Sequence, residues 1–148
     1  RAQPMAVAPS ADADSGGDLM VKLLALFLFA IGCTTVTYAP AEFAPGNTDR
    51  ATFETALAYW RSCGADVAEA ESAPYAMTLG DLGGEGGGVQ RGGLITIDYS
   101  NALDVFVYAH EMGHALGLTH APDGVPSAMS EKRWTLDAPL SADVAEFR

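Results

Sequence analysis

One eleven-residue segment constrains this chain more than any other, because it predicts a helix, a turn and a cluster of histidines at once. The segment runs from His110 to His120 and reads His-Glu-Met-Gly-His-Ala-Leu-Gly-Leu-Thr-His. His110 and His114 are four residues apart, so on a helix both imidazoles leave the same face. Gly117 accepts a positive φ, which lets the helix end there and brings His120 back toward the other two.

This histidine spacing predicts a zinc site. Three imidazole nitrogens can bind one zinc ion at about 2.0–2.1 Å each and leave a fourth position for water, as a catalytic site requires. Glu111 follows the first histidine, so it would lie beside the metal and could reach that water without being a strong ligand. The alternative is three ordinary histidines around a core helix. Against it, five fixed positions rarely coincide by chance, and the chain has no other histidine.

The segment resembles the metzincin zinc-peptidase signature, and it is most similar to the matrixin branch and its bacterial relatives. The resemblance implies a methionine on a tight turn beneath the metal, and Met129, within Ser-Ala-Met-Ser at 127–130, fits. It implies an α/β (α+β) fold of the zincin type, with a twisted, mostly parallel sheet, two long helices and a small C-terminal subdomain. It also implies a single catalytic zinc ion and a peptide substrate extended against an edge strand. That edge is either residues 94–97 or a segment within 86–91.

The chain departs from this family in three places. Glu131, Lys132 and Arg133 occupy the stretch where two metzincin branches carry a metal-proximal tyrosine. Ala121 follows the third histidine, where matrixins usually have serine. No further histidine is present for the second, structural zinc of matrixins.

The remaining elements are predicted from hydrophobic patterning and turn residues. The sequence predicts four of the family's five strands, with residues 80–93 as a glycine-rich loop. The helix around Trp60 has an apolar face, and the helix that carries the histidines is predicted to be capped by Ser100 or Asn101. The predicted strands cover residues 34–38, 66–68, 75–79 and 94–97. The first predicted helix is capped by Asn47 or Thr48 and stopped by Gly64, and the other two cover 102–116 and 141–148.

Residues 1–33 are predicted to be a leader and residues 34–148 the catalytic domain. Residues 1–18 lack periodicity and favour disorder. Lys22 followed by nine apolar residues at 23–31 is typical of a signal peptide. Nine apolar residues are too few to cross a bilayer as a helix, which needs about 20. The residues that end at Cys33 resemble a bacterial lipobox, which implies a lipid tether on Cys33. We therefore expect a secreted protein or one anchored at the cell envelope; a buried segment is the alternative for residues 23–31.

Charge excludes some partners. The formal net charge of −11 repels phosphate backbones, so we expect no nucleic-acid partner, and it disfavours docking on anionic lipid. The expected partner is a peptide or protein substrate.

Two weaker signals remain. Asp81 and Glu85 lie in the glycine-rich loop and could hold calcium, although a solvated loop explains them as well. The residues around Cys63 resemble the matrixin cysteine switch only superficially, because that interpretation would leave too short a catalytic domain. Cys63 is predicted instead to be a small buried residue at a helix end.

Together these features predict a zinc-dependent endopeptidase that cleaves extracytoplasmic proteins, with water activated by Glu111. One alternative is a catalytically silent, zinc-stabilised binding domain, against which the intact Glu111 argues. Another is a truncated gene product with an incomplete fold, which the unusual leader and the short final helix would suggest.

Overall fold

A computed structural model describes residues 34–38, 48–83 and 86–148 of the chain. The predicted leader, including the predicted lipidation site at Cys33, lies outside these residues. Within the described ranges, no helix combines the length and the apolar character that crossing a membrane requires.

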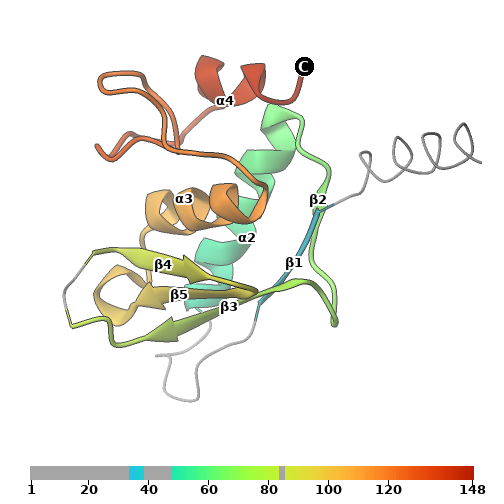
Figure 1. The fold of residues 1–148 in the computed structure, drawn as a ribbon, viewed down its shortest axis with the longest axis vertical. Helices are drawn as coiled ribbons and strands as arrows, with labels where there is room; N and C mark the ends of the chain where they lie inside the picture. The colour runs from blue at the N-terminus through green and yellow to red at the C-terminus, as the bar shows by residue number, and fades with distance from the viewer. Residues whose placement is uncertain (1–33, 39–47, 84–85) are drawn as a thin grey trace, which may run out of the picture. The chain divides into compact units, whose positions relative to one another are not determined.

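A five-stranded sheet forms one layer of the fold (Figure 1). All neighbouring strands are parallel except β4, which pairs antiparallel with β5 at one edge. The spatial order is β2-β1-β3-β5-β4, with β1 (Thr34–Tyr38), β2 (Val67–Ala68), β3 (Tyr75–Gly80), β4 (Gly88–Arg91) and β5 (Leu94–Asp98). This architecture confirms the expected fold class, a mixed α/β domain with a mostly parallel sheet.

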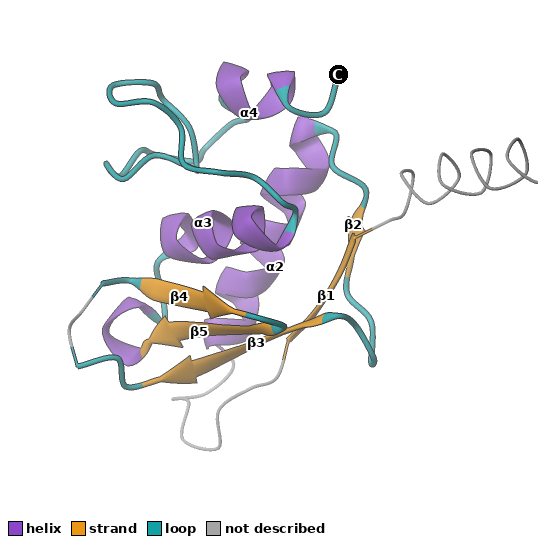
Figure 2. Ribbon diagram, viewed as in Figure 1, coloured by secondary structure: helices purple, strands orange, loops and turns teal. Residues whose placement is uncertain are grey.

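The two long helices lie over the same face of the sheet (Figure 1). They are α2 (Thr48–Cys63) and α3 (Val105–Ala115). The chain after α3 is mostly irregular until the short helix α4 (Ser141–Ala145), as the coloring of Figure 2 makes plain. A single 3-10 turn, η1 (Tyr99–Asn101), links β5 to α3.

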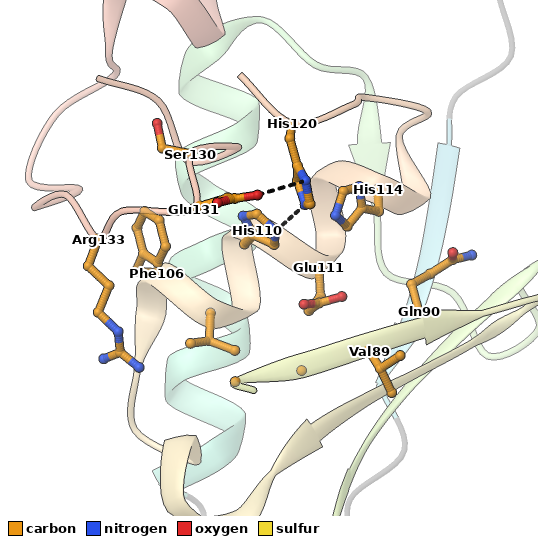
Figure 3. Close-up of a pocket in the computed structure, with 13 residues that line it drawn as sticks. Val89, Gln90, Phe106, His110, Glu111, His114, His120, Ser130, Glu131 and Arg133 are labelled. Carbon is orange, nitrogen blue, oxygen red and sulfur yellow. Dashed lines mark hydrogen bonds and ion pairs between the residues drawn. The ribbon is translucent and has the colours of Figure 1, made fainter. Parts of the chain in front are cut away.

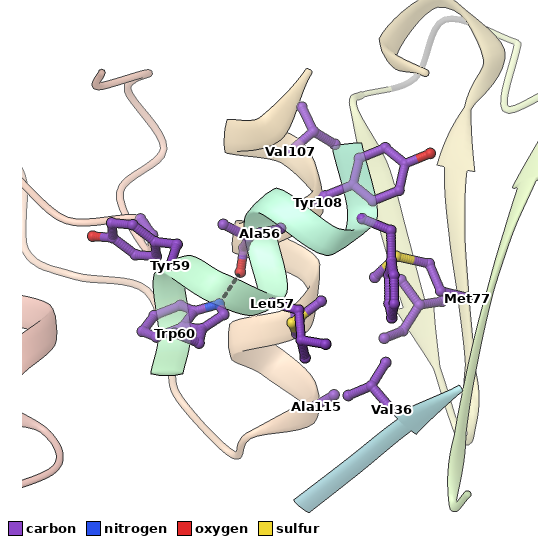
Figure 4. Close-up of a cluster of buried hydrophobic side chains, with 14 of the residues drawn as sticks. Val36, Ala56, Leu57, Tyr59, Trp60, Met77, Val107, Tyr108 and Ala115 are labelled. Carbon is purple, nitrogen blue, oxygen red and sulfur yellow. Dashed lines mark hydrogen bonds between the residues drawn. The ribbon is translucent and has the colours of Figure 1, made fainter. Parts of the chain in front are cut away.

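The core forms between this sheet face and the two helices. Met77 in β3 and Ile95 and Ile97 in β5 point into it, because alternate residues of a strand face the same side. Trp60 of α2 is fully buried, and its indole N–H donates to the carbonyl of Ala109 in α3 at 2.8 Å (Figure 4). This hydrogen bond satisfies the one polar atom of a large buried ring and ties the two helices together.

Three predicted features differ in the structure. The glycine-rich loop contains a fifth strand, β4, which needs no hydrophobic pattern because pairing with β5 supplies its hydrogen bonds. Helix α3 begins later than expected and is capped by Asp104, whose carboxylate accepts from the N–H groups of Phe106 and Val107. The predicted caps, Ser100 and Asn101, belong to η1 instead. The last helix ends at Ala145 rather than running to the end of the chain.

Candidate metal centre and active site

Helix α3 ends in a turn at Gly117, as the sequence predicts. Gly117 has φ of +86° and follows the C-cap Leu116. The N–H of Gly117 donates to the carbonyl of His114, and the N–H of Leu118 donates to the carbonyl of Gly113, both at 3.0 Å. This pair of bonds is a Schellman motif, which satisfies carbonyls at the helix end and turns the chain back.

The same turn orients His114. Its Nδ1 lies 3.0 Å from the carbonyl oxygen of Leu118, one residue past the glycine. A carbonyl can only accept, so Nδ1 carries the proton and Nε2 is left with a free lone pair. The Gly117 turn therefore positions a ligand on the helix as well as the residues that follow it.

His110 is oriented by a different segment. Its Nδ1 donates to the carbonyl of Ala128 at 2.9 Å, so its Nε2 is also free to bind a metal. Burial lowers the pKa of His110 below its ordinary value, and the hydrogen bond to Ala128 opposes that shift only in part. This shift favours the neutral form of the ring, which a metal ligand needs.

His120 completes the cluster from the loop after the turn. Its Nε2 lies 3.2 Å from Nε2 of His110, and its ring centroid lies 4.9 Å from that of His114. Its side chain is 51% exposed, and its Nδ1 faces the carboxylate of Glu131 at 4.0 Å. The third histidine thus lies in a more open setting than the other two.

The three histidines fit a zinc ion. One ligand atom from each can be chosen so that all lie within 4.8 Å of one another. Two nitrogens bound to one tetrahedral zinc at about 2.0–2.1 Å would be separated by about 3.3 Å, close to the observed 3.2 Å between His110 and His120. Neutral imidazole is a donor that zinc prefers, and three such ligands leave a position open.

Glu111 lies in the same cleft, on the next residue of α3. It is only 6% exposed, and burial raises the pKa of its carboxyl while nearby His114 opposes the shift to a smaller extent. In Figure 3 its carboxylate points from α3 toward the strand that carries Val89 and Gln90. The site therefore places one carboxylate between the histidine cluster and the edge of the sheet.

Met129 lies on a turn that packs against α3, the helix that carries His110 and His114. The turn is closed by hydrogen bonds from the N–H of Ser130 to the Ser127 carbonyl and from the N–H of Met129 to the Ser127 hydroxyl. Met129 is buried, and its sulfur lies where a side chain on Gly113 would begin, 2.1 Å from the ideal Cβ position. Gly113, between the two helix histidines, is therefore what lets this turn approach α3.

A buried carboxylate that the sequence did not single out supports this turn. Asp143 of α4 accepts hydrogen bonds from the Ser127 hydroxyl, from the N–H of Ala128 at 2.9 Å, and from the Tyr59 hydroxyl of α2. It thereby fixes the segment whose Ala128 carbonyl orients His110. A polar residue at the first turn of a short helix is ordinarily a cap, so its sequence context carried no sign of this role.

The cleft itself has a volume of about 560 Å³ and opens between α3, β4 and the segment after Met129 (Figure 3). Its polar lining includes Glu131 and Arg133 in addition to the histidines and Glu111. Arg133 is held away from the metal cluster by Asp104 and by Asn101, to which it donates at 2.8 Å. The described lining residues are Gly87, Gly88, Val89, Gln90, Phe106, Val107, His110, Glu111, His114, His120, Ser130, Glu131 and Arg133.

The weaker signals gain no support. Among the described residues the histidines are the one group arranged to hold a metal. Asp81 accepts from the N–H of Gly83 at 2.8 Å, which is a local turn, and Glu85 lies outside the described residues. Cys63 is the last residue of α2, a buried free thiol whose pKa burial raises to about 11, and it is not among the cleft residues.

An α/β domain that gathers three histidines and a buried glutamate beside a sheet edge has the arrangement of a zinc-dependent peptidase. The comparison with family models also identifies a peptidase, and it names the family. The chain belongs to the peptidase M66 family, whose model matches residues 61–138, more than half of the chain.

Other comparisons add a distant likeness. A solved structure of high choriolytic enzyme 1, a hatching enzyme zinc-protease from the medaka fish Oryzias latipes, is 18% identical with a TM-score of 0.42. The match covers 58% of this chain and 44% of that one, so the chain spans less than half the length of that enzyme. Comparison with curated proteins finds no match.

Proposed function

We propose that this chain is an endopeptidase in which His110, His114 and His120 hold one catalytic zinc ion and Glu111 is the general base. The observation that carries the proposal is the convergence of three imidazoles within 4.8 Å in a cleft that also holds a buried glutamate. Met129 and Gly117 are structural in this scheme: one supports the helix from below and the other turns the chain to His120.

The division of labour follows from the chemistry of each group. A bound zinc ion acidifies water and polarises a carbonyl group. Glu111 accepts the proton of the attacking water on a carboxylate oxygen and donates it to the leaving amine. Because burial raises the pKa of Glu111, its carboxylate holds a proton more readily than an exposed glutamate would, which suits a group that must take and return one.

The substrate is proposed to lie along β4. This strand ends the order of the sheet, so its outer side presents backbone N–H and C=O groups to an extended peptide, which could add as a further strand. Of the two edges that the sequence left open, β5 is flanked by β3 and β4, which favours β4. The matrixin-like subtype remains part of the proposal and is supported by the sequence of residues 110–120, whereas Met129 and its turn support the wider metzincin class.

Export is proposed from the leader alone. The apolar stretch at 23–31 after Lys22 supports a signal peptide, and the residues before Cys33 support lipidation of that cysteine. The expected result is an intact mass of membrane-extracted protein that exceeds the peptide mass by a lipid group. A mature protein of unmodified mass would overturn the lipid tether without affecting the peptidase.

The peptidase is tested by Glu111→Gln, which keeps the size of the side chain and removes its basicity. We expect loss of kcat on the order of 10²- to 10⁴-fold with zinc content unchanged, because general-base catalysis contributes about that much. Glu54→Gln, at an exposed position on α2, is the control for losing one carboxylate. Chelation should abolish cleavage by the wild-type protein.

Two outcomes would contradict this assignment. Cleavage by folded, zinc-loaded Glu111→Gln at the wild-type rate would remove Glu111 from the mechanism. A wild-type protein that binds one zinc yet cleaves no member of a mixed peptide library would favour the zinc-stabilised binding domain instead.

A further inference from the structure

Gly88 of β4 lies so close to the proposed general base, Glu111, that it leaves no room for a side chain of its own. An ideal Cβ on Gly88 of β4 would lie 2.6 Å from Cγ of Glu111 and 3.0 Å from both Cδ and Oε1. Real Cβ atoms essentially never approach another heavy atom to 2.6 Å, so any other residue at 88 would overlap the Glu111 side chain.

The backbones on both sides of this contact are fixed. In β4, Gly88 is paired with Ile97 of β5, and the neighbouring Gly87 carbonyl accepts from the N–H of Asp98 at 3.0 Å. On the helix side, Met112 follows Glu111 and Ala109 lies two residues before it, and both are fully buried. The group able to move is the Glu111 side chain, because its torsions cost less to change than a packed helix or a paired strand.

Gly87 provides the contrast. An ideal Cβ there would lie 2.8 Å from Cγ2 and 3.1 Å from Cγ1 of Val107, one turn earlier on α3. Neither glycine has a positive φ, so alanine would cause no backbone strain at either position. The two glycines thus approach one helix to within 0.2 Å of the same distance, 2.8 and 2.6 Å, but of the two only Gly88 approaches the Glu111 carboxylate.

We propose that Gly88 is a positioning residue for Glu111: the space left by its missing side chain is the space in which the Glu111 carboxylate lies beside the histidines. This inference rests on the proposed function, since it gives the location of the base rather than its identity. It also explains why an edge strand beside the cleft contains glycine, which weakens a strand elsewhere.

The kinetic test compares Gly88→Ala with Gly87→Ala in zinc-loaded protein. We expect Gly88→Ala to lower kcat on the order of 100-fold with KM little changed, because a base displaced by about 1 Å costs that much. Gly87→Ala should lower kcat less, because the side chain that must move is Val107 and not Glu111. In a Glu111→Gln background, Gly88→Ala should cause no further loss. A loss carried by KM alone, or one that persists undiminished in the Glu111→Gln protein, would overturn the proposal.

A second measurement does not depend on activity. Gly88→Ala should lower the melting temperature when residue 111 is glutamate, and Glu111→Ala should relieve that shift by removing the overlapping atoms. The shift caused by Gly87→Ala should be the same in both backgrounds, because Val107 is unaffected.

The two measurements separate this inference from the proposed function. If Gly88→Ala lowers the melting temperature equally in both backgrounds, Gly88 does not act through Glu111, whatever the chain catalyses. If the background matters but the wild-type protein cleaves nothing, the contact is real and the peptidase proposal fails.

Discussion

The two histidines on α3 and the one on the following loop differ in how they are held. His110 and His114 donate from Nδ1 to the carbonyls of Ala128 and Leu118, at 2.9 and 3.0 Å. At the Nδ1 of His120 the partner is the carboxylate of Glu131, which lies farther away, at 4.0 Å, and whose side chain is 77% exposed. Hydrogen bonds within the protein therefore fix the ring orientations of His110 and His114, whereas the ring of His120 is held more loosely.

This difference shows what a helix and a loop each contribute to a metal centre. The helix gives two ligands at a fixed separation, and turns at either side fix their ring orientation through backbone carbonyls. The loop brings a third ligand within reach but leaves its ring half in solvent. We expect the helix pair to dominate the affinity for zinc and His120 to adjust it.

The largest effect is expected when one zinc ligand is removed, either from α3 or from the loop that follows it. His114→Ala should weaken zinc binding more than His120→Ala, by a further factor of about 10–100, which is what an oriented ligand partner is ordinarily worth. Competition with a chromophoric chelator measures both dissociation constants, and the melting temperature of each metal-free variant shows whether the fold survives. Equal losses in the two variants would mean that the loop ligand is held as firmly as the helix ligand.

A smaller effect is expected from the outer partner of His120. Glu131→Gln should lower zinc affinity by about tenfold at most, because the carboxylate stabilises the bound imidazole from 4.0 Å. The effect should shrink as salt is added, since an exposed pair is screened. Asp137→Asn, exposed in the same segment, removes the same charge and should leave the affinity unchanged. Identical behaviour of the two variants would assign Glu131 only a general electrostatic effect.

The smallest effect concerns pH. Because burial lowers the pKa of folded His110, the unfolded chain takes up a proton first as pH falls. The contribution of His110 to stability is therefore present above its unfolded pKa of about 6.5 and is lost as pH falls toward the folded value. Metal-free wild-type protein should lose more stability between pH 7 and pH 5 than His110→Gln.

Glu111 changes the stability in the opposite direction as pH falls. Its raised folded pKa favours the folded state as pH falls, but it is present in both proteins and largely cancels from the difference. A His110→Gln protein with the same pH dependence as the wild type, measured by thermal unfolding after chelation, would show that burial of His110 is not coupled to folding.

Local rules account for the parts of the fold that the sequence predicted well. The apolar face of α2 and the Val, Ile and Thr residues of β1, β3 and β5 follow patterns that depend on near neighbours along the chain. The positive φ of Gly117 is likewise local, because only glycine takes that conformation without cost.

The errors were of a different kind. β4 was not among the predicted strands, although a segment within 86–91 was one of two candidate edges, because its four residues, Gly-Val-Gln-Arg, have no hydrophobic alternation. The two glycines between Arg91 and Leu94 are a known signal for a tight hairpin, and Gly92 has the positive φ such a turn uses. The cap of α3 was misplaced because Ser, Asn and Asp all stand near its start, and only the η1 turn decides among them.

The sequence by itself determined the helix pair, the glycine turn and the identity of the candidate ligands, because spacing along a helix and the freedom of glycine are properties of a short segment. Only the tertiary structure decided which carbonyl orients each histidine, that Asp143 supports the turn of Met129, and that Gly88 leaves room for Glu111. These contacts join residues far apart in the chain. Their existence depends on how closely a strand, a helix and a turn approach one another, and that distance is set by packing of the whole core.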